Sequence, residues 1–164
     1  MKGVIVLVVK SNLKWKALII NIAVPLLTGA IASLISREGF KEYGNVVQPA
    51  LSPPGWLFPI VWTILYILMG ISTYLIYEKD KTINKPSLIL YAIQLAINFI
   101  WPVFFFGFKA YLFSFILLIV LTLFVVTMII FFYKENKLSG LIQIPYLLWL
   151  IFASYLNLSV FILN

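Results

Sequence analysis

Residues 53–66, PPGWLFPIVWTILY, begin as a proline-rich loop and continue as a long apolar helix. Proline fixes φ and disfavours helix in the residue before it, so the helix should begin at or just after Pro54. Trp56 then lies at the helix start, where an aromatic residue anchors a span at the membrane interface. Trp62 lies about 9 Å deeper at the helical rise. An interfacial anchor does not need that depth, so Trp62 is a candidate functional residue.

The composition around this stretch is that of an integral membrane protein. Of 164 residues, 63% are hydrophobic and 10% are charged, whereas soluble domains average about 45–50% apolar and about 25% charged residues. We therefore expect a single membrane domain over residues 1–164. The net charge of +7 is attributed to short basic loops that set topology, and we expect no nucleic-acid partner.

Five segments are apolar enough to cross a bilayer, which takes about 20 residues. They are residues 17–36, 56–77, 87–107, 110–133 and 140–163. The sequence thus predicts an all-α membrane protein, a bundle of five transmembrane helices surrounded by lipid. Residues 3–9 form a run too short for a span, and we interpret them as a separate segment at the membrane interface.

The distribution of lysine and arginine predicts the orientation. Nine of these residues lie on the N-terminal side of the predicted topology: Lys2, Lys10, Lys14, Lys16, Lys79, Lys81, Lys85, Lys134 and Lys137. Three lie on the other side: Arg37, Lys41 and Lys109. Because basic loops remain in the cytoplasm, we expect a multi-pass protein of a bacterial cell membrane with a cytoplasmic N-terminus.

Several chemistries are excluded by the residues that the chain lacks. It has no cysteine and no histidine, so thiol catalysis, imidazole metal sites and Ser-His triads are absent. All five acidic residues fall in or beside the predicted loops, whereas ion-coupled transporters usually carry an ionisable group within a span. We expect no metal and no cofactor, and we disfavour ion-coupled transport.

The loop over residues 37–55 is the only long connection between predicted spans. Long loops in compact proteins tend to be functional, and its prolines reduce the entropy lost when the loop docks. We interpret it as a lid; the alternative is a disordered connector.

Three predicted helices carry polar and aromatic residues on one face. Amides at membrane depth need partners inside the protein, so Gln94, Asn98 and Asn157 should point inward. The other residues on the same faces, which are mostly aromatic, should point inward with them: Trp62, Tyr66, Tyr91, Trp101, Tyr146, Trp149, Ala153 and Leu156.

Three inward indoles predict a pocket. Membrane helices approach each other through small residues, so Trp62, Trp101 and Trp149 would hold helices apart and could share one cavity. Indole faces suit flat ligands. The alternative is that these side chains fill the bundle core. On the opposite face of the third span, Ala92 and Ala96 form a small-xxx-small pair, which predicts a homodimer through that face.

The motifs together resemble the TspO / translocator protein family, also called tryptophan-rich sensory proteins or peripheral-type benzodiazepine receptors. The matching blocks follow the family's order and spacing: Gln48-Pro49, Pro53-Pro54-Gly55-Trp56, Pro59 to Trp62, Leu65-Tyr66, Met69-Gly70, Gln94 to Asn98, Trp101-Pro102, Phe104 to Gly107, Pro145 to Trp149, Phe152-Ala153 and Leu156-Asn157.

The resemblance implies a five-helix bundle, usually dimeric, with a pocket under the loop that binds porphyrins, isoquinoline-carboxamide and benzodiazepine-type ligands and, in some members, sterols. It places Phe58, Trp62, Asn98, Trp101, Trp149, Ala153 and Leu156 in that pocket, and Phe113 at the position of a frequent pocket aromatic. In bacterial members, the positions of Trp62 and Trp149 are linked to light-dependent degradation of protoporphyrin.

The chain departs from the family in the loop and at its end. Glu42-Tyr43 stands where Trp-Tyr is frequent, and Leu51 where an aromatic residue is frequent, so the lid has less aromatic surface. The residues after Leu156 contain neither tyrosine nor a basic residue, which does not support sterol binding through that segment.

Three functions remain open. A receptor or sensor for tetrapyrroles is the leading hypothesis. A porphyrin-degrading enzyme would have to work photo-oxidatively, because the sequence offers no acid–base pair. A transporter is the third, although no inverted repeat is evident.

Overall fold

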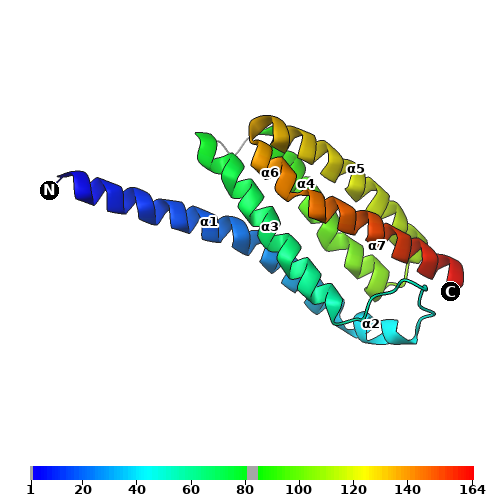
Figure 1. Ribbon diagram of the computed structural model, residues 1–164. Coiled ribbons are helices and arrows are strands. Elements are labelled where there is room, and N and C mark those ends of the chain that lie inside the picture. Colours follow the sequence, from blue (N-terminus) through cyan, green and yellow to red (C-terminus); the bar gives the residue numbers. More distant parts are fainter. Residues whose placement is uncertain (1, 81–84) are drawn as a thin grey trace.

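The computed structural model describes the backbone of residues 2–80 and 85–164 and the side chains of residues 14–79 and 85–164. The described chain is helical and has no strands. Its elements, shown in Figure 1, are α1 (Lys2–Ile35), α2 (Arg37–Glu42), the 3-10 turn η1 (Tyr43–Asn45), α3 (Leu57–Asp80), α4 (Pro86–Pro102), the π-helix η2 (Val103–Gly107), α5 (Tyr111–Glu135), α6 (Lys137–Ile142) and α7 (Ile144–Leu163).

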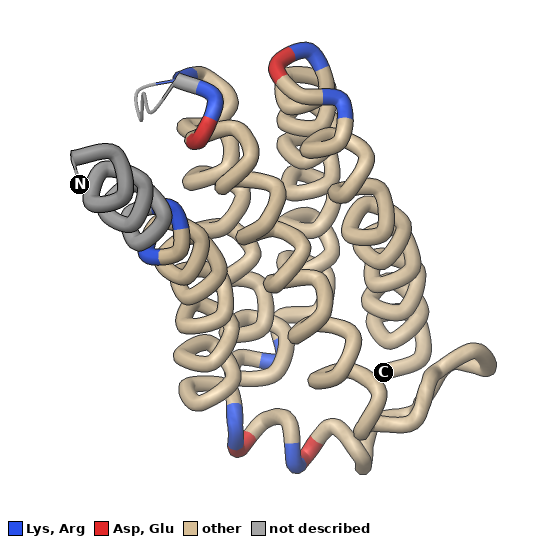
Figure 2. Tube along the Cα trace, turned by 60° about the vertical axis from the view of Figure 1, so that its left-hand side comes forward, with Lys and Arg blue, Asp and Glu red and all other residues tan. Residues whose placement is uncertain are grey.

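Five helical segments are long and apolar enough to cross a membrane, which confirms the predicted all-α bundle. They are Lys14–Ile35, Leu57–Lys79, Pro86–Gly107, Tyr111–Glu135 and Lys137–Leu163. Figure 2 shows the charged residues gathered at the two ends of the bundle. The side chains of Lys2, Lys10 and Lys81, which entered the orientation argument, lie outside the described residues.

The first helix differs from the sequence prediction. Residues 3–9 were expected to form a segment separate from the first span, but α1 runs without a break from Lys2 to Ile35. Residues 10–17 contain neither proline nor glycine, so nothing local ends the helix between the two apolar runs.

The third and fifth spans are both interrupted. After Pro102 the backbone of α4 continues as the π-helix η2, with Phe108 N donating to Val103 O at 3.1 Å; π-helical turns are rare and often occur at functional sites. The fifth span divides at Gln143, just before Pro145, into α6 and α7.

Small residues allow the closest helix contacts. A Cβ on Gly70 of α3 would lie 2.4 Å from the Cα of Ile22 in α1. Where α3 meets α6, the hydroxyls of Ser72 and Ser139 each donate to the other residue's carbonyl at 2.7 Å. These contacts place α3 between α1 and α6, consistent with membrane helices approaching through small residues.

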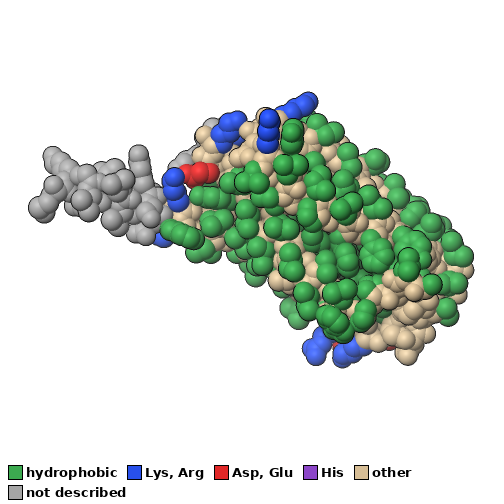
Figure 3. Space-filling model, viewed as in Figure 1, with side chains coloured by type: hydrophobic (Ala, Val, Ile, Leu, Met, Phe, Trp, Pro, Cys, Tyr) green, Lys and Arg blue, Asp and Glu red, His purple; other side chains and the backbone are tan. Residues whose placement is uncertain are grey.

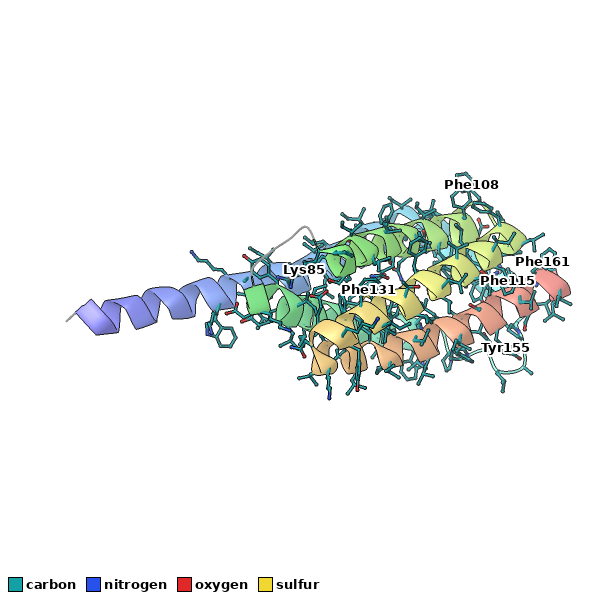
Figure 4. The ribbon with its side chains drawn as sticks, turned by 90° about the horizontal axis from the view of Figure 1, so that it is seen from above. Lys85, Phe108, Phe115, Phe131, Tyr155 and Phe161 are labelled. Atoms are coloured by element: carbon teal, nitrogen blue, oxygen red, sulfur yellow. The ribbon has the colours of Figure 1, made fainter. Side chains whose placement is uncertain are left out.

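The outside of the bundle is apolar. Figure 3 shows hydrophobic side chains covering the visible face between the basic ends, and Figure 4 shows Phe108, Tyr155 and Phe161 at its outside; all three are exposed in the isolated chain. Such a surface requires a lipid environment, so the chain is an integral, multi-pass membrane protein.

Candidate functional site

A chain of hydrogen bonds crosses the middle of the bundle. Tyr66 on α3 donates its hydroxyl to Asn98 Oδ1 at 2.7 Å. Asn98 Nδ2 donates to the Tyr146 hydroxyl at 3.0 Å, and Tyr146 donates to Gln94 Oε1 at 2.9 Å. All four residues are buried. The inward amides of the third span therefore join α3, α4 and α7.

A second link lies nearer the loop. The Trp101 indole donates from Nε1 to Asn157 Oδ1 at 3.1 Å, and Asn157 Nδ2 donates to the Tyr111 carbonyl at 2.7 Å. This link connects α4, α7 and the start of α5. It also fixes the orientation of the Trp101 ring, because the indole has only one polar atom.

The structure brings two of the three predicted indoles together. The rings of Trp62 and Trp101 lie 6.2 Å apart, centroid to centroid, and Trp62 also packs on Tyr66 at 5.6 Å. Trp149 instead makes ring contacts with Phe58 at 6.0 Å and with Phe152 at 5.5 Å. Trp149 thus lies behind Phe58, rather than beside the other two indoles.

A first cavity, which we call the α1–α3 cavity, has a volume of about 570 Å³. It lies between the loop-proximal halves of α1, α3 and α4, and Trp62, Tyr66, Asn98 and Trp101 line it. Gly29 lines it from α1, where a Cβ would lie 2.1 Å from the Tyr66 ring. A side chain at position 29 would displace the tyrosine that holds Asn98.

The second, which we call the loop cavity, has a volume of about 540 Å³ and lies beneath residues 40–55. Ala153, Leu156 and Asn157 of α7 line it opposite the loop. Four residues line both cavities: Phe40, Phe58, Trp101 and Phe106. The two cavities therefore share an aromatic wall.

The loop, predicted as one long connection, contains α2 and η1 and is held to the bundle at several points. Glu42 Oε2 and Lys109 Nζ lie 2.7 Å apart, and the Lys109 hydrogen bond lowers the pKa of the Glu42 carboxyl from its ordinary value. Asn164 accepts from Val47 N at 3.0 Å and donates to Val47 O at 3.3 Å. These bonds join the loop to the α4–α5 connection and to the end of α7.

The remaining predicted site residues occupy different positions. Tyr146 is fully buried behind Asn98. Phe113 is 45% exposed, packs on Phe104 with centroids 4.7 Å apart and lines neither cavity. Ala92 and Ala96 are exposed on the outside of α4.

Sequence reasoning missed the contribution of α1 and α2. Gly29 and Ala32 of α1, Ser36 in the turn that follows it and Phe40 of α2 all line the α1–α3 cavity. The available signal was the run of small residues in GAIAS, residues 29–33, because such residues mark a face that another element approaches closely.

Comparison with known proteins gives a consistent result over nearly the whole chain. The sequence profile of the TspO/MBR family matches residues 21–163. The chain is 34% identical to the tryptophan-rich protein TspO of Archaeoglobus fulgidus, over 90% of this chain and 96% of the relative. It is 31% identical to the tryptophan-rich sensory protein of Cereibacter sphaeroides, over 93% and 94%, and 30% identical to the human translocator protein, over 77% and 76%. With five membrane-spanning helices and this match, the chain belongs to the TspO/MBR family.

Proposed function

We propose that the protein is a membrane receptor or sensor that binds porphyrins and other tetrapyrroles, as well as isoquinoline- and benzodiazepine-type ligands. The observation that carries this proposal is the pair of indoles, Trp62 and Trp101, which line the α1–α3 cavity beside Asn98. Ring faces contact a flat aromatic ligand over a large area, and buried amides and hydroxyls can orient it. No cofactor enters the proposal, because the porphyrin is the ligand.

The dimensions of the site support a ligand of this class. Small-molecule sites are usually apolar clefts of about 300–1,000 Å³ with a few fixed polar groups, and the α1–α3 cavity falls within that range. Its wall is shared with the loop cavity, so movement of Phe40 or Phe106 would join the two spaces. A macrocycle larger than either cavity could then occupy both.

Replacing Trp62 with phenylalanine should weaken binding of protoporphyrin about tenfold, because the smaller ring loses contact area with the ligand. Quenching of the remaining tryptophan fluorescence, titrated in lipid nanodiscs, measures the dissociation constant. Trp56→Phe is the matched control, since Trp56 is 65% exposed and lines neither cavity. Equal dissociation constants for the two variants would reject Trp62 as a ligand contact.

We also propose a homodimer through the outward face of α4. Ala92 and Ala96 are exposed there, and Ile89 and Ile93 on the same helix are 52% and 39% exposed. A narrow face of small residues flanked by larger ones allows a second helix to approach closely. In this proposal the N-terminus of each subunit lies in the cytoplasm, which the distribution of basic residues supports.

The double substitution Ala92→Leu/Ala96→Leu should convert the dimer to monomers, because the added side chains prevent close helix contact. Chemical crosslinking in membranes, followed by sizing in detergent, measures the dimer fraction. Leu123→Phe on α5 enlarges another outward residue, one that is 63% exposed, and should leave the fraction unchanged. A fully dimeric double variant would contradict this interface.

A further inference from the structure

The α1–α3 cavity has a mouth on the side of the bundle. Six residues that line the cavity are also exposed on the outside: Leu27, Ala30 and Ser33 of α1, Phe40 of α2, and Pro59 and Thr63 of α3. The α4 residue at the back of the cavity, Trp101, is only 7% exposed. Most of the rim that reaches the outside therefore belongs to α1 and α3, with Phe40 of α2 at its loop end, and α4 closes the opposite wall.

The mouth opens onto lipid rather than onto water. Its rim residues on α1 and α3 lie within the membrane spans Lys14–Ile35 and Leu57–Lys79. Toward the far end of the bundle, α1 and α3 are closed against each other at Gly70, where a Cβ would meet the Ile22 backbone. Nearer the loop, a Cβ on Gly29 would meet the Tyr66 ring. The cavity begins at this contact between α1 and α3.

A buried hydroxyl at the wall of this cavity lacks a partner. Ser36 is 2% exposed and lines the cavity, and its Oγ has no hydrogen-bond partner among the described residues. Serine hydroxyls within helices commonly bond to the carbonyl four residues earlier, as Ser114 and Ser154 do here at 2.9 and 2.8 Å, whereas Ser36 lies in the turn between α1 and α2 and makes no such bond. An unsatisfied buried hydroxyl is costly, so a ligand group that bonds to Ser36 would relieve that cost.

The loop over the second cavity is held to the bundle at several points. The Glu42–Lys109 ion pair and the two bonds between Asn164 and Val47 hold the loop to the rest of the bundle. Ring contacts of Tyr43 with Phe105 and Phe106, at 5.6 and 5.4 Å, add to this closure. Lifting the loop requires several of these contacts to break together, whereas entry through the mouth breaks none of them.

We propose that a membrane-dissolved ligand enters the α1–α3 cavity sideways, between α1 and α3, from the lipid leaflet on the loop side. The ligand is mostly apolar and planar, so that it partitions into the bilayer and passes the rim. It carries a hydrogen-bonding group that reaches Ser36. This route rests on the proposed function, because it delivers the ligand to the indole pair described above.

The absence of cysteine from the chain allows a direct test. A short bifunctional thiol reagent would bridge Ala30→Cys and Thr63→Cys across the mouth, in nanodiscs with protoporphyrin supplied in the lipid phase. Stopped-flow tryptophan quenching measures both rates. Relative to the same cysteine variant before it is bridged, closing the mouth should slow association and dissociation alike, each by about tenfold or more.

A matched bridge closes the other route. Glu42→Cys and Lys109→Cys replace an ion pair whose charged atoms lie 2.7 Å apart, and neither residue lines a cavity. Bridging them locks the loop, and both rates should stay within about twofold of the unbridged protein. The opposite pattern, with slow exchange only when the loop is locked, would overturn the lateral route.

A second variant controls for distortion of the protein by the covalent bridge. Ala30→Phe/Thr63→Phe narrows the mouth without a covalent link and should also slow both rates. Saturable quenching with rates that neither mouth variant changes would overturn the lateral route but leave the proposed function intact. No saturable quenching by the unmodified protein would instead contradict ligand binding itself.

Discussion

Replacing Gly70 with alanine should destabilise the bundle and push α1 away from α3. The new Cβ would lie 2.4 Å from Ile22 Cα and 2.7 Å from the Asn21 carbonyl oxygen. These atoms belong to the backbone and cannot rotate aside, so the helix must move. Overpacking of this kind costs about 1–3 kcal/mol, and we expect the upper part of that range. Unfolding in mixed SDS and mild-detergent micelles measures the loss of stability.

Two controls separate this effect from a general effect of adding a methyl group. Gly44→Ala, in the loop, introduces a Cβ with no atom within 4 Å and should leave stability close to that of the unmodified protein. Gly29→Ala meets the Tyr66 ring instead of backbone; it should cost less stability because the ring can shift, although it disturbs the bond to Asn98. An unfolding midpoint for Gly70→Ala equal to that for Gly44→Ala would contradict the close helix contact.

Replacing Asn98 with leucine should reduce both stability and ligand binding. Asn98 accepts from Tyr66 and donates to Tyr146, and it is 2% exposed. The substitution leaves the buried Tyr66 hydroxyl without its acceptor, while Tyr146 keeps its bond to Gln94. An unsatisfied buried group costs about 1–3 kcal/mol. The same unfolding assay, combined with the porphyrin titration, measures both effects.

Thr122→Val is the matched control for the loss of a polar group within a span. Its hydroxyl bonds only to the Leu118 carbonyl of its own helix at 2.7 Å, and it lines neither cavity. We expect a small change in stability and an unchanged dissociation constant. If Asn98→Leu behaved like Thr122→Val in both assays, the hydrogen-bond chain would not organise the site.

The residues of the third span show how far the sequence argument reaches. Gln94 and Asn98 were predicted to point inward because lipid offers amides no partner, and the structure buries both, with bonds to Tyr146. The helical period alone places Tyr91 and Trp101 on the same face, and these residues are buried too. Periodicity predicts which face turns inward, because it is a local property of the chain.

The relative rotation and spacing of helices are not local. Trp62 and Trp149 both lie on faces predicted to turn inward, yet Trp62 meets Trp101 while Trp149 packs behind Phe58. The distances between α3, α4 and α7 decide that difference, and they depend on contacts such as Ser72 with Ser139. The continuity of α1 and the π-helix after Pro102 are likewise visible only in the folded chain.

By itself, the sequence determined that this chain has five membrane-spanning helices with Gln94, Asn98 and Asn157 turned inward, because the cost of burying polar groups in lipid acts on each helix separately. Only the tertiary structure decided that the interior is divided into two cavities by Phe40, Phe58, Trp101 and Phe106, and that the α1–α3 cavity opens toward lipid. The physical reason is that a cavity is the space left between several helices. Its walls and its mouth depend on how closely glycine and serine residues, far apart in the chain, allow those helices to approach.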